Sequence, residues 1–197
     1  MPDNYLREEM LRTFLHEEMK RYDQGTWEHS LRVGKLCKLI ALEMDFGKPE
    51  VAYITLAGLL HDVGKVFMPD LINFPRSLAV KEKYMVSHHP EIGSKFVKIT
   101  WEQDLPPEVF DGIGLHHERM DGTGYPYRLS GEEIPDAARI VAAADVFDAM
   151  NNFRPYRPPL PMDEILDELT GSGYDNNVVY ALLQRIKHQN WHLAPAY

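Results

Sequence analysis

The sequence contains a single cysteine, Cys37, which excludes an internal disulfide and a zinc site built from thiolates. Basic residues are also scarce: 21 Lys and Arg stand against 30 Asp and Glu, so the formal net charge is −9. We therefore expect no binding to a nucleic-acid polymer along a basic stripe. The longest apolar stretch, residues 51–60, is interrupted by Thr55 and is too short to cross a bilayer. The first residues lack the basic and apolar segments of a secretion signal, so we expect a cytoplasmic protein without a membrane partner.

The composition and the spacing of apolar residues predict an all-α fold. The chain has 197 residues, of which 44% are hydrophobic and 26% charged, as in one globular domain. Apolar residues recur at helical spacing between glycines and prolines. The predicted helices cover residues 6–21, a segment that is capped by Thr26 and includes His29 to Ile40, and residues 49–61, 80–89, 91–99, 107–117, 137–150, 163–170 and 176–187. Counting the segments on either side of Pro90 as one helix that restarts, we expect a bundle of seven to eight helices, with at most a small hairpin at residues 125–129. Residues 1–24 would form an N-terminal helix, and residues 25–197 the main domain.

Nine histidines are the first indication of chemistry. Five of them, with two aspartates, lie in or at the ends of predicted helices beside apolar residues: His29, His61, Asp62, His89, His116, His117 and Asp145. One histidine in such a place is more often a hydrogen-bonded core residue than a metal ligand. Seven such groups pointing inward would be costly to bury unless they neutralised one another. The joint pattern therefore favours metal binding.

Imidazole and carboxylate ligands without thiolate suit iron, manganese, nickel or zinc. The donor types alone do not decide among these four metals. Seven ligands are too many for one ion and suit two ions that share an aspartate. Two ions roughly 3.5–4 Å apart can generate a bridging hydroxide and stabilise the leaving oxygen of a phosphate ester. The residues thus indicate a dinuclear metallohydrolase.

Two segments resemble a known family. His61-Asp62-Val63-Gly64-Lys65 resembles the HD superfamily of metal-dependent phosphohydrolases. The stretch HHERMDGTGYP, from His116 to Pro126, resembles the HD-GYP subfamily, whose characterised members hydrolyse the bacterial second messenger cyclic di-GMP. Further matches follow in order around His29, at residues 89–93, from Arg139 to Arg157 and at residues 171–178. The resemblance covers about residues 26 to 185 and implies the HD-domain helical bundle.

The resemblance also implies roles for individual residues. All seven histidines and aspartates named above would be metal ligands, with Asp62 bridging the two ions. Lys65 would act with Asp62 in catalysis, directing a cation at the phosphate and assisting the leaving oxygen. Substrate contacts are implied for Lys65, Arg154, Arg157 and Tyr125, although Tyr125 suits packing under the loop of residues 122–126 equally well. Gly122, Gly124 and Pro126 would shape that loop.

Two positions depart from the family pattern. Gly25 stands where members with a third metal carry a glutamate, so we expect two ions. Residues 74–76, Phe-Pro-Arg, replace the usual Lys-Pro-Gly, which alters the loop and the access of ligand to the site. Two other side chains each allow two interpretations. Asp148 either contacts a metal ligand or is exposed, and Arg139 binds either a backbone carbonyl or Asp62.

The expected function is a phosphodiesterase that opens cyclic di-GMP by attack of the bridging hydroxide and yields linear pGpG, GMP or both. A second hypothesis is a metal-holding binding module without turnover, which either senses cyclic di-GMP or recruits a partner such as a diguanylate cyclase or another signalling protein. A third is an HD phosphohydrolase that acts on another nucleotide or cyclic dinucleotide. A substrate panel and a turnover assay separate the three hypotheses.

Overall fold

The computed structural model describes residues 17, 23–72, 78–101, 103–153 and 157–188. Its α-helices are α2 (Gln24–Glu43), α3 (Lys48–Leu60), α4 (Pro69–Ile72), α5 (Val80–Val86), α6 (His89–Trp101), α7 (Pro107–Leu115), α8 (Asp136–Asn151), α9 (Met162–Leu169) and α10 (Asn176–His188). Two 3-10 helices accompany them, η1 (Val63–Phe67) and η2 (Gly131–Glu133). Within these residues there is no strand, only an isolated antiparallel bridge between Asp121 and Ser130. The predicted all-α bundle is therefore confirmed.

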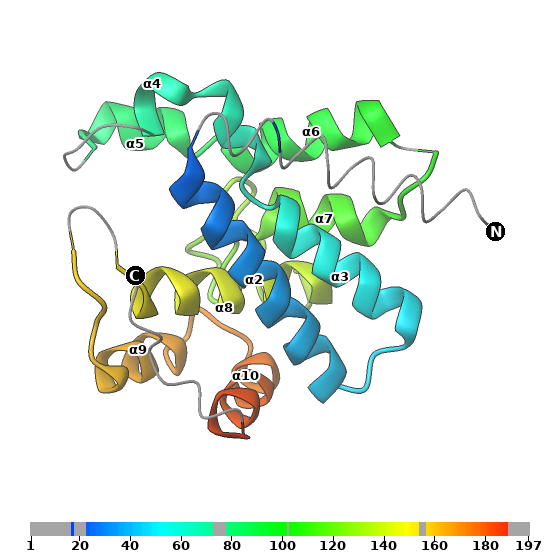
Figure 1. The fold of residues 1–197 in the computed structure, drawn as a ribbon, viewed down its shortest axis with the longest axis vertical. Coiled ribbons are helices and arrows are strands. Elements are labelled where there is room, and N and C mark those ends of the chain that lie inside the picture. The colour runs from blue at the N-terminus through cyan, green and yellow to red at the C-terminus, as the bar shows by residue number, and fades with distance from the viewer. Residues whose placement is uncertain (1–16, 18–22, 73–77, 102, 154–156, 189–197) are drawn as a thin grey trace.

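Helix α2 crosses the middle of the molecule and packs against α3, α8 and α10 (Figure 1). Helix α7 lies against α3, α6 and α8. One hydrophobic core fills the space among α2, α3, α8, α9 and α10, with Ile40, Phe147 and Leu182 fully buried in it. A second core lies among α3, α6, α7 and the start of α2, around Leu60 and Ile113. Because α2 and α3 contribute to both cores, they hold the two halves of the bundle together.

Two helix boundaries, the start of α2 and the end of α5, lie more than two residues from those predicted. Helix α2 begins at Gln24 because Asp23, and not Thr26, is its N-cap: the Asp23 carboxylate accepts hydrogen bonds from the backbone N–H groups of Gly25 and Thr26, at 3.2 and 3.0 Å. His89 begins α6 instead of ending the helix before it, since α5 stops at Val86. Pro90 therefore lies in the first turn of α6, where its missing N–H group costs no helical hydrogen bond.

Glycines allow two close approaches that bring the predicted ligands together. A Cβ atom on Gly64 would lie 2.0 Å from the His89 carbonyl oxygen, so η1 packs directly on the start of α6. A Cβ atom on Gly112 would lie 2.6 Å from Ala57 Cβ, so α7 packs equally closely on α3. These contacts place the ends of α3 and α7 beside the beginning of α6.

Several predictions fall on residues that the structure does not describe. Residues 1–16 and 18–22, which hold most of the predicted N-terminal helix, are among them, as are residues 74–76 and Arg154.

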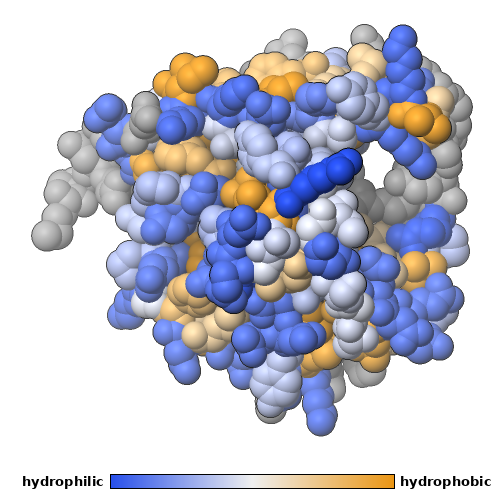
Figure 2. All heavy atoms as spheres, turned by 180° about the vertical axis from the view of Figure 1, so that it is seen from behind, coloured by the Kyte–Doolittle hydropathy of each residue, from blue (hydrophilic) through white to orange (hydrophobic). Residues whose placement is uncertain are grey.

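On the face turned away from the viewer of Figure 1, hydrophilic residues predominate and hydrophobic ones form separate patches (Figure 2). Among the helices that are described, none has the length and apolar character to span a bilayer.

Candidate metal centre

All seven predicted ligands converge on one region of the bundle. They come from five helices or helix ends: His29 from α2, His61 and Asp62 from the end of α3, His89 from the start of α6, His116 and His117 from the turn after α7, and Asp145 from α8. Their donor atoms form three overlapping groups in which all atoms lie within 4.8 Å of one another: His29, His61 and Asp62; His61, His116 and Asp145; and His89, His116 and His117. Five of the seven residues are buried, and the other two are partly buried.

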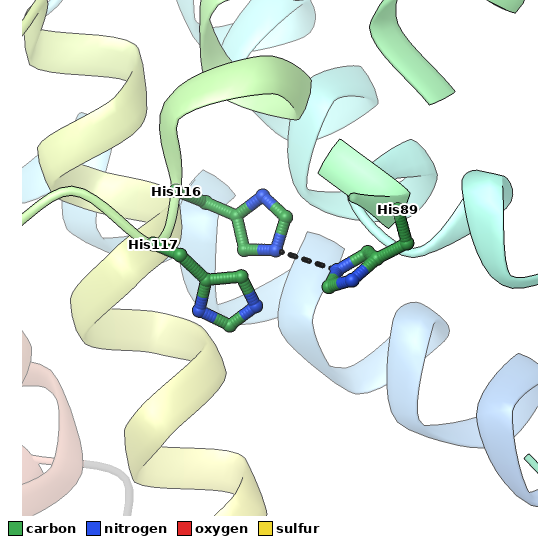
Figure 3. A group of neighbouring side chains, drawn as sticks. All are labelled: His89, His116 and His117. Atoms are coloured by element: carbon green, nitrogen blue, oxygen red, sulfur yellow. Dashed lines mark hydrogen bonds between the residues drawn. The ribbon is translucent and has the colours of Figure 1, made fainter. Parts of the chain in front are cut away.

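Three histidines are oriented in the same way. His61, His89 and His116 each place Nδ1 within 2.7–2.8 Å of the carbonyl oxygen three residues earlier. A carbonyl only accepts, so Nδ1 carries the proton and Nε2 keeps a lone pair for a ligand. The Nε2 atoms of His89 and His116 are 3.4 Å apart, with the His117 ring beside them (Figure 3). This is the arrangement that metal-binding histidines require.

Asp62 lies between the two halves of the cluster. One carboxylate oxygen, Oδ1, is 3.2 Å from His89 Nε2, and the other, Oδ2, is 3.4 Å from His61 Nε2. Lys65, on η1, places Nζ 2.6 Å from the same Oδ2. Asp62 thus contacts histidines from both α3 and α6, as expected of a residue that bridges two ions.

Asp145 closes the cluster on the α2 side, and its Oδ1 lies 2.9 Å from His29 Nε2 and 3.7 Å from His61 Nε2. Two atoms at the centre, His61 Nε2 and Asp62 Oδ1, are buried and have no hydrogen-bond partner among the residues that the structure describes. Buried polar atoms left in that state are costly. A nitrogen lone pair and a carboxylate oxygen are also donors that divalent ions accept. The residues therefore fit a metal site.

The charges around the centre favour metal binding. Burial lowers the pKa of His116 and His117 well below the ordinary value, and neighbouring histidines lower it further, so both stay neutral. Burial raises the pKa of Asp62, but a neighbouring histidine and Lys65 outweigh this effect and hold it well below its usual range. The pKa of Asp145 is likewise lowered by nearby histidines in spite of burial. Neutral imidazoles and ionised carboxylates are the forms that ligate metals.

His29 differs from the other histidines in its support. Its Nδ1 lies 2.7 Å from Asp148 Oδ2, so Asp148 contacts a predicted ligand and is not exposed. Arg32 donates two hydrogen bonds to the Asp148 carboxylate, at 2.8 and 3.0 Å, and Asn152 donates a third at 2.9 Å. Neither Arg32 nor Asn152 was predicted from the sequence to have a role in the site. The available signal was their spacing, since Arg32 lies one helical turn after His29 and Asn152 one turn after Asp148.

The loop from Gly122 to Pro126 packs against the histidines. Gly122 has φ +76°, a left-handed conformation that favours glycine. A Cβ atom on Gly124 would lie 2.5 Å from backbone atoms of the preceding turn, so only glycine fits there. Tyr125, followed by a cis peptide bond to Pro126, stacks on the His117 ring with centroids 4.6 Å apart. Tyr125 therefore packs under the loop and also borders the metal centre.

Two further side chains hold the segment that follows this loop, residues 127–134. Glu118, missed by the sequence analysis, is buried and accepts hydrogen bonds from the backbone N–H groups of Tyr127 and Leu129, at 2.7 and 3.0 Å. Its place directly after the histidine pair was the available signal. Arg139 donates to the Ile134 carbonyl oxygen at 2.6 Å and to the Gly131 carbonyl oxygen at 3.2 Å. Of its two interpretations, the structure supports the backbone carbonyl.

Two of the predicted phosphate contacts lie among the described residues. Lys65 has a quarter of its side chain exposed, so its Nζ contacts Asp62 while part of the side chain reaches solvent. Arg157 donates through Nη2 to the Ala149 carbonyl oxygen at 2.7 Å, while its Nη1 is buried and has no partner in the described part of the chain. Ala149 lies one turn beyond Asp145 on α8, which places the guanidinium by the C-terminal part of that helix.

Comparison with known proteins identifies the family. The model of the HD domain matches residues 13–178. The chain belongs to the HD domain family. A cyclic di-GMP phosphodiesterase of Thermotoga maritima is 38% identical over 167 residues, which make up 82% of this chain and 45% of that protein. The 3'3'-cGAMP-specific phosphodiesterase 1 of Vibrio cholerae is 31% identical over 177 residues, 88% of this chain and 40% of that protein. This HD domain thus spans less than half the length of these two relatives.

A solved structure shows the same fold. Bd1817, described as an HDG"Y"P protein from Bdellovibrio bacteriovorus, superposes with a TM-score of 0.68 at 23% identity, over 82% of this chain and 52% of that one. The family match and the relative from Thermotoga confirm the predicted resemblance to HD-GYP proteins. HD-domain phosphohydrolases depend on metal, and the cluster of histidines and aspartates in this HD domain can hold it.

Proposed function

We propose that this HD domain is a metal-dependent phosphodiesterase that hydrolyses cyclic di-GMP to linear pGpG, GMP or both. The observation that carries the proposal is the single buried cluster of five histidines and two aspartates, with Tyr125 of the GYP loop stacked against it. The relative from Thermotoga, named a cyclic di-GMP phosphodiesterase, supports the choice of substrate.

The proposed centre holds two divalent ions, iron or manganese, with nickel and zinc as the alternatives. One ion would take His29, His61, Asp62 and Asp145, and the other His89, His116, His117 and Asp62 as the shared ligand. When bound, such ions supply Lewis acidity toward the phosphate and an activated water for its hydrolysis.

Basic side chains of the chain itself then bind and orient the substrate. With a net charge of −9, the protein as a whole repels a dinucleotide that carries two phosphates, so the attraction must be local. Lys65, partly exposed beside Asp62, offers an ammonium group to a phosphate oxygen. Arg157 is proposed to bind a phosphate as well, because a guanidinium group suits phosphate recognition. Arg154 is proposed for the same task from sequence alone.

Incubation of purified, metal-loaded protein with cyclic di-GMP tests the proposal, with the products separated by chromatography. We expect linear pGpG or GMP to form, and we expect a chelator to abolish their formation. Tight binding of intact cyclic di-GMP by calorimetry, with no product over hours in iron, manganese and nickel preparations, would reject catalysis in favour of the receptor hypothesis.

A second candidate substrate is 3'3'-cGAMP, because a relative at 31% identity is named for its specificity toward that compound. Both dinucleotides carry two phosphates in a closed ring and present the same groups to Lys65 and Arg157. Parallel assays at equal concentration decide between them through the ratio of kcat/KM values. We expect cyclic di-GMP to be preferred, and a higher kcat/KM for 3'3'-cGAMP would reassign the substrate. Association with a diguanylate cyclase or another signalling protein stays a prediction.

A further inference from the structure

The histidines of the metal centre have two kinds of support. His61, His89 and His116 each donate Nδ1–H to a neutral backbone carbonyl in their own segment. His29 instead places Nδ1 2.7 Å from the carboxylate of Asp148, which belongs to a different helix. A carboxylate acceptor fixes the tautomer as a carbonyl does, and its charge also makes the imidazole a stronger donor at Nε2.

The Asp148 carboxylate is firmly held. It is almost fully buried, and Arg32 contacts both of its oxygens, at 2.8 and 3.0 Å. Asn152 donates a further hydrogen bond at 2.9 Å. A bidentate guanidinium contact fixes the direction of a carboxylate as well as balancing its charge. Asp148 therefore presents a fixed acceptor to His29.

The ligands and their supports come from the same two helices. Arg32 follows His29 by three residues on α2, and Asp148 follows Asp145 by three residues on α8. Residues three apart lie on the same face of a helix, so the contact between α2 and α8 carries the ligand pair His29 and Asp145 with the supporting pair behind it. Among the contacts described, the group of His89, His116 and His117 has no such carboxylate support on Nδ1.

We propose that Asp148, held by Arg32, is a positioning residue that orients His29 and strengthens the binding of the ion that His29 ligates. The ion at His89, His116 and His117 is held without it, so the two positions differ in affinity and in their dependence on Asp148. This inference rests on the metal centre of the proposed function.

A manganese titration tests the inference. Metal-free protein competes with a fluorescent chelator for Mn²⁺, and the wild type is expected to bind two equivalents. Asp148→Asn keeps the shape of the side chain and removes its charge. We expect it to weaken one equivalent about 10- to 100-fold and to leave the other unchanged. Glu43→Gln is the matched control. Glu43 lies fourteen residues after His29 on α2, and its carboxylate likewise pairs with an arginine, Arg185, at 2.7 Å. This variant should bind as the wild type does.

A double-mutant cycle identifies which equivalent is affected. His29→Ala should lose the same equivalent, and Asp148→Asn should then cause no further change. The inference is overturned if Asp148→Asn weakens both equivalents equally, changes neither, or weakens Mn²⁺ binding further in the His29→Ala background. If Asp148→Asn does not fold, Arg32→Lys replaces it, because lysine keeps the charge without the bidentate contact. It should weaken the same equivalent by a smaller factor, and unchanged binding would overturn the inference.

The inference and the proposed function fail in different ways. If the wild type binds Mn²⁺ and hydrolyses cyclic di-GMP while Asp148→Asn behaves identically, only the role of Asp148 is wrong. If the wild type binds no metal, or binds it without hydrolysis, the proposed function fails at the same titration or at the turnover assay.

Discussion

Among the side chains of the centre, Asp62 contacts residues from several different elements. It contacts His89 through one oxygen and both His61 and Lys65 through the other. No other carboxylate of the described residues contacts histidines from both α3 and α6. The environment around Asp62 also holds it in the ionised form. The sharpest consequences at the scale of single residues therefore concern Asp62 and its neighbour Lys65.

Asp62→Ala is expected to lose both metal ions together, because the shared oxygen ligands disappear from both positions. Metal analysis of the protein purified without oxygen provides the measurement. Asp136→Ala, which removes a mostly exposed carboxylate from the start of α8, is the control and should retain two ions. One ion retained at full occupancy in Asp62→Ala would show that the ligand assignment is wrong.

Lys65→Met is expected to lower kcat by about 10²-fold or more, the range typical of a lost acid–base or charge-stabilising group. Its metal content should stay at two ions, because Lys65 is not a ligand. Lys95→Met is the matched control, since Lys95 also pairs with a carboxylate at hydrogen-bond distance, Glu91 on the exposed side of α6. Steady-state kinetics with cyclic di-GMP measure the difference, and equal kcat values for the two variants would exclude Lys65 from catalysis.

At the scale of elements, the centre depends on how closely η1 and α6 approach each other. Their contact has no room for a side chain, since a Cβ atom on Gly64 would lie 2.0 Å from the His89 carbonyl oxygen and 2.9 Å from Gly93 N. Both of these neighbours are backbone atoms, which cannot move aside as a flexible side chain can. The short helix after Asp62 and the first turn of α6 therefore set the distance between the Asp62 and His89 side chains.

Gly64→Ala should force η1 and α6 apart, at a cost of about 3 kcal/mol or more in the free energy of unfolding. It should also weaken metal binding, because Asp62 and His89 would separate. Chemical denaturation and a metal titration provide the two measurements. Gly25→Ala is the control, because its Cβ atom would meet only ordinary contacts at 3.5 Å or more. A Gly64→Ala protein as stable as this control would show that the contact is looser than described.

At the scale of the whole molecule, much of the fold and site could be predicted from sequence. The apolar periodicity predicted the helices of the bundle, and α8, α9 and α10 begin and end within about two residues of the predicted bounds. The seven histidines and aspartates were chosen because polar groups on apolar helix faces are costly, and all seven come together. The sequence was sufficient where a feature depends on neighbouring residues, as the helices do.

The remaining features depend on contacts between segments that lie far apart in the sequence. Asp23 and Thr26 lie three positions apart and both residue types are common N-caps, so capping propensity alone does not show which of them begins α2. The contact of Asp148 with His29 joins residues 119 positions apart, so nothing local to either residue reveals it. The burial of Glu118 follows from the path of the loop above it. Pair geometry of this kind emerges only from the packed structure.

Removal of the metal should destabilise the whole domain, because the buried ligands come from α2, α3, α6, α8 and the turn after α7. At free metal about 100 times the dissociation constant, binding to the native state alone adds about 2.7 kcal/mol. We therefore expect a clear fall in the melting temperature after chelation, and full recovery when Mn²⁺ is restored. Calorimetry of both forms measures the change. Identical melting temperatures would contradict metal binding by the native state.

The order of the ligands along the polypeptide has a consequence for how the protein matures. His29 meets Asp145 across 116 positions, and the remaining ligands are spread between them. During synthesis, more than a hundred residues are added after His29 before its partner Asp145 is made. A fragment that ends before α8 contains six of the seven proposed ligands and lacks only Asp145. Completion of the proposed two-ion centre is therefore a late event, which follows the docking of α8 onto α2.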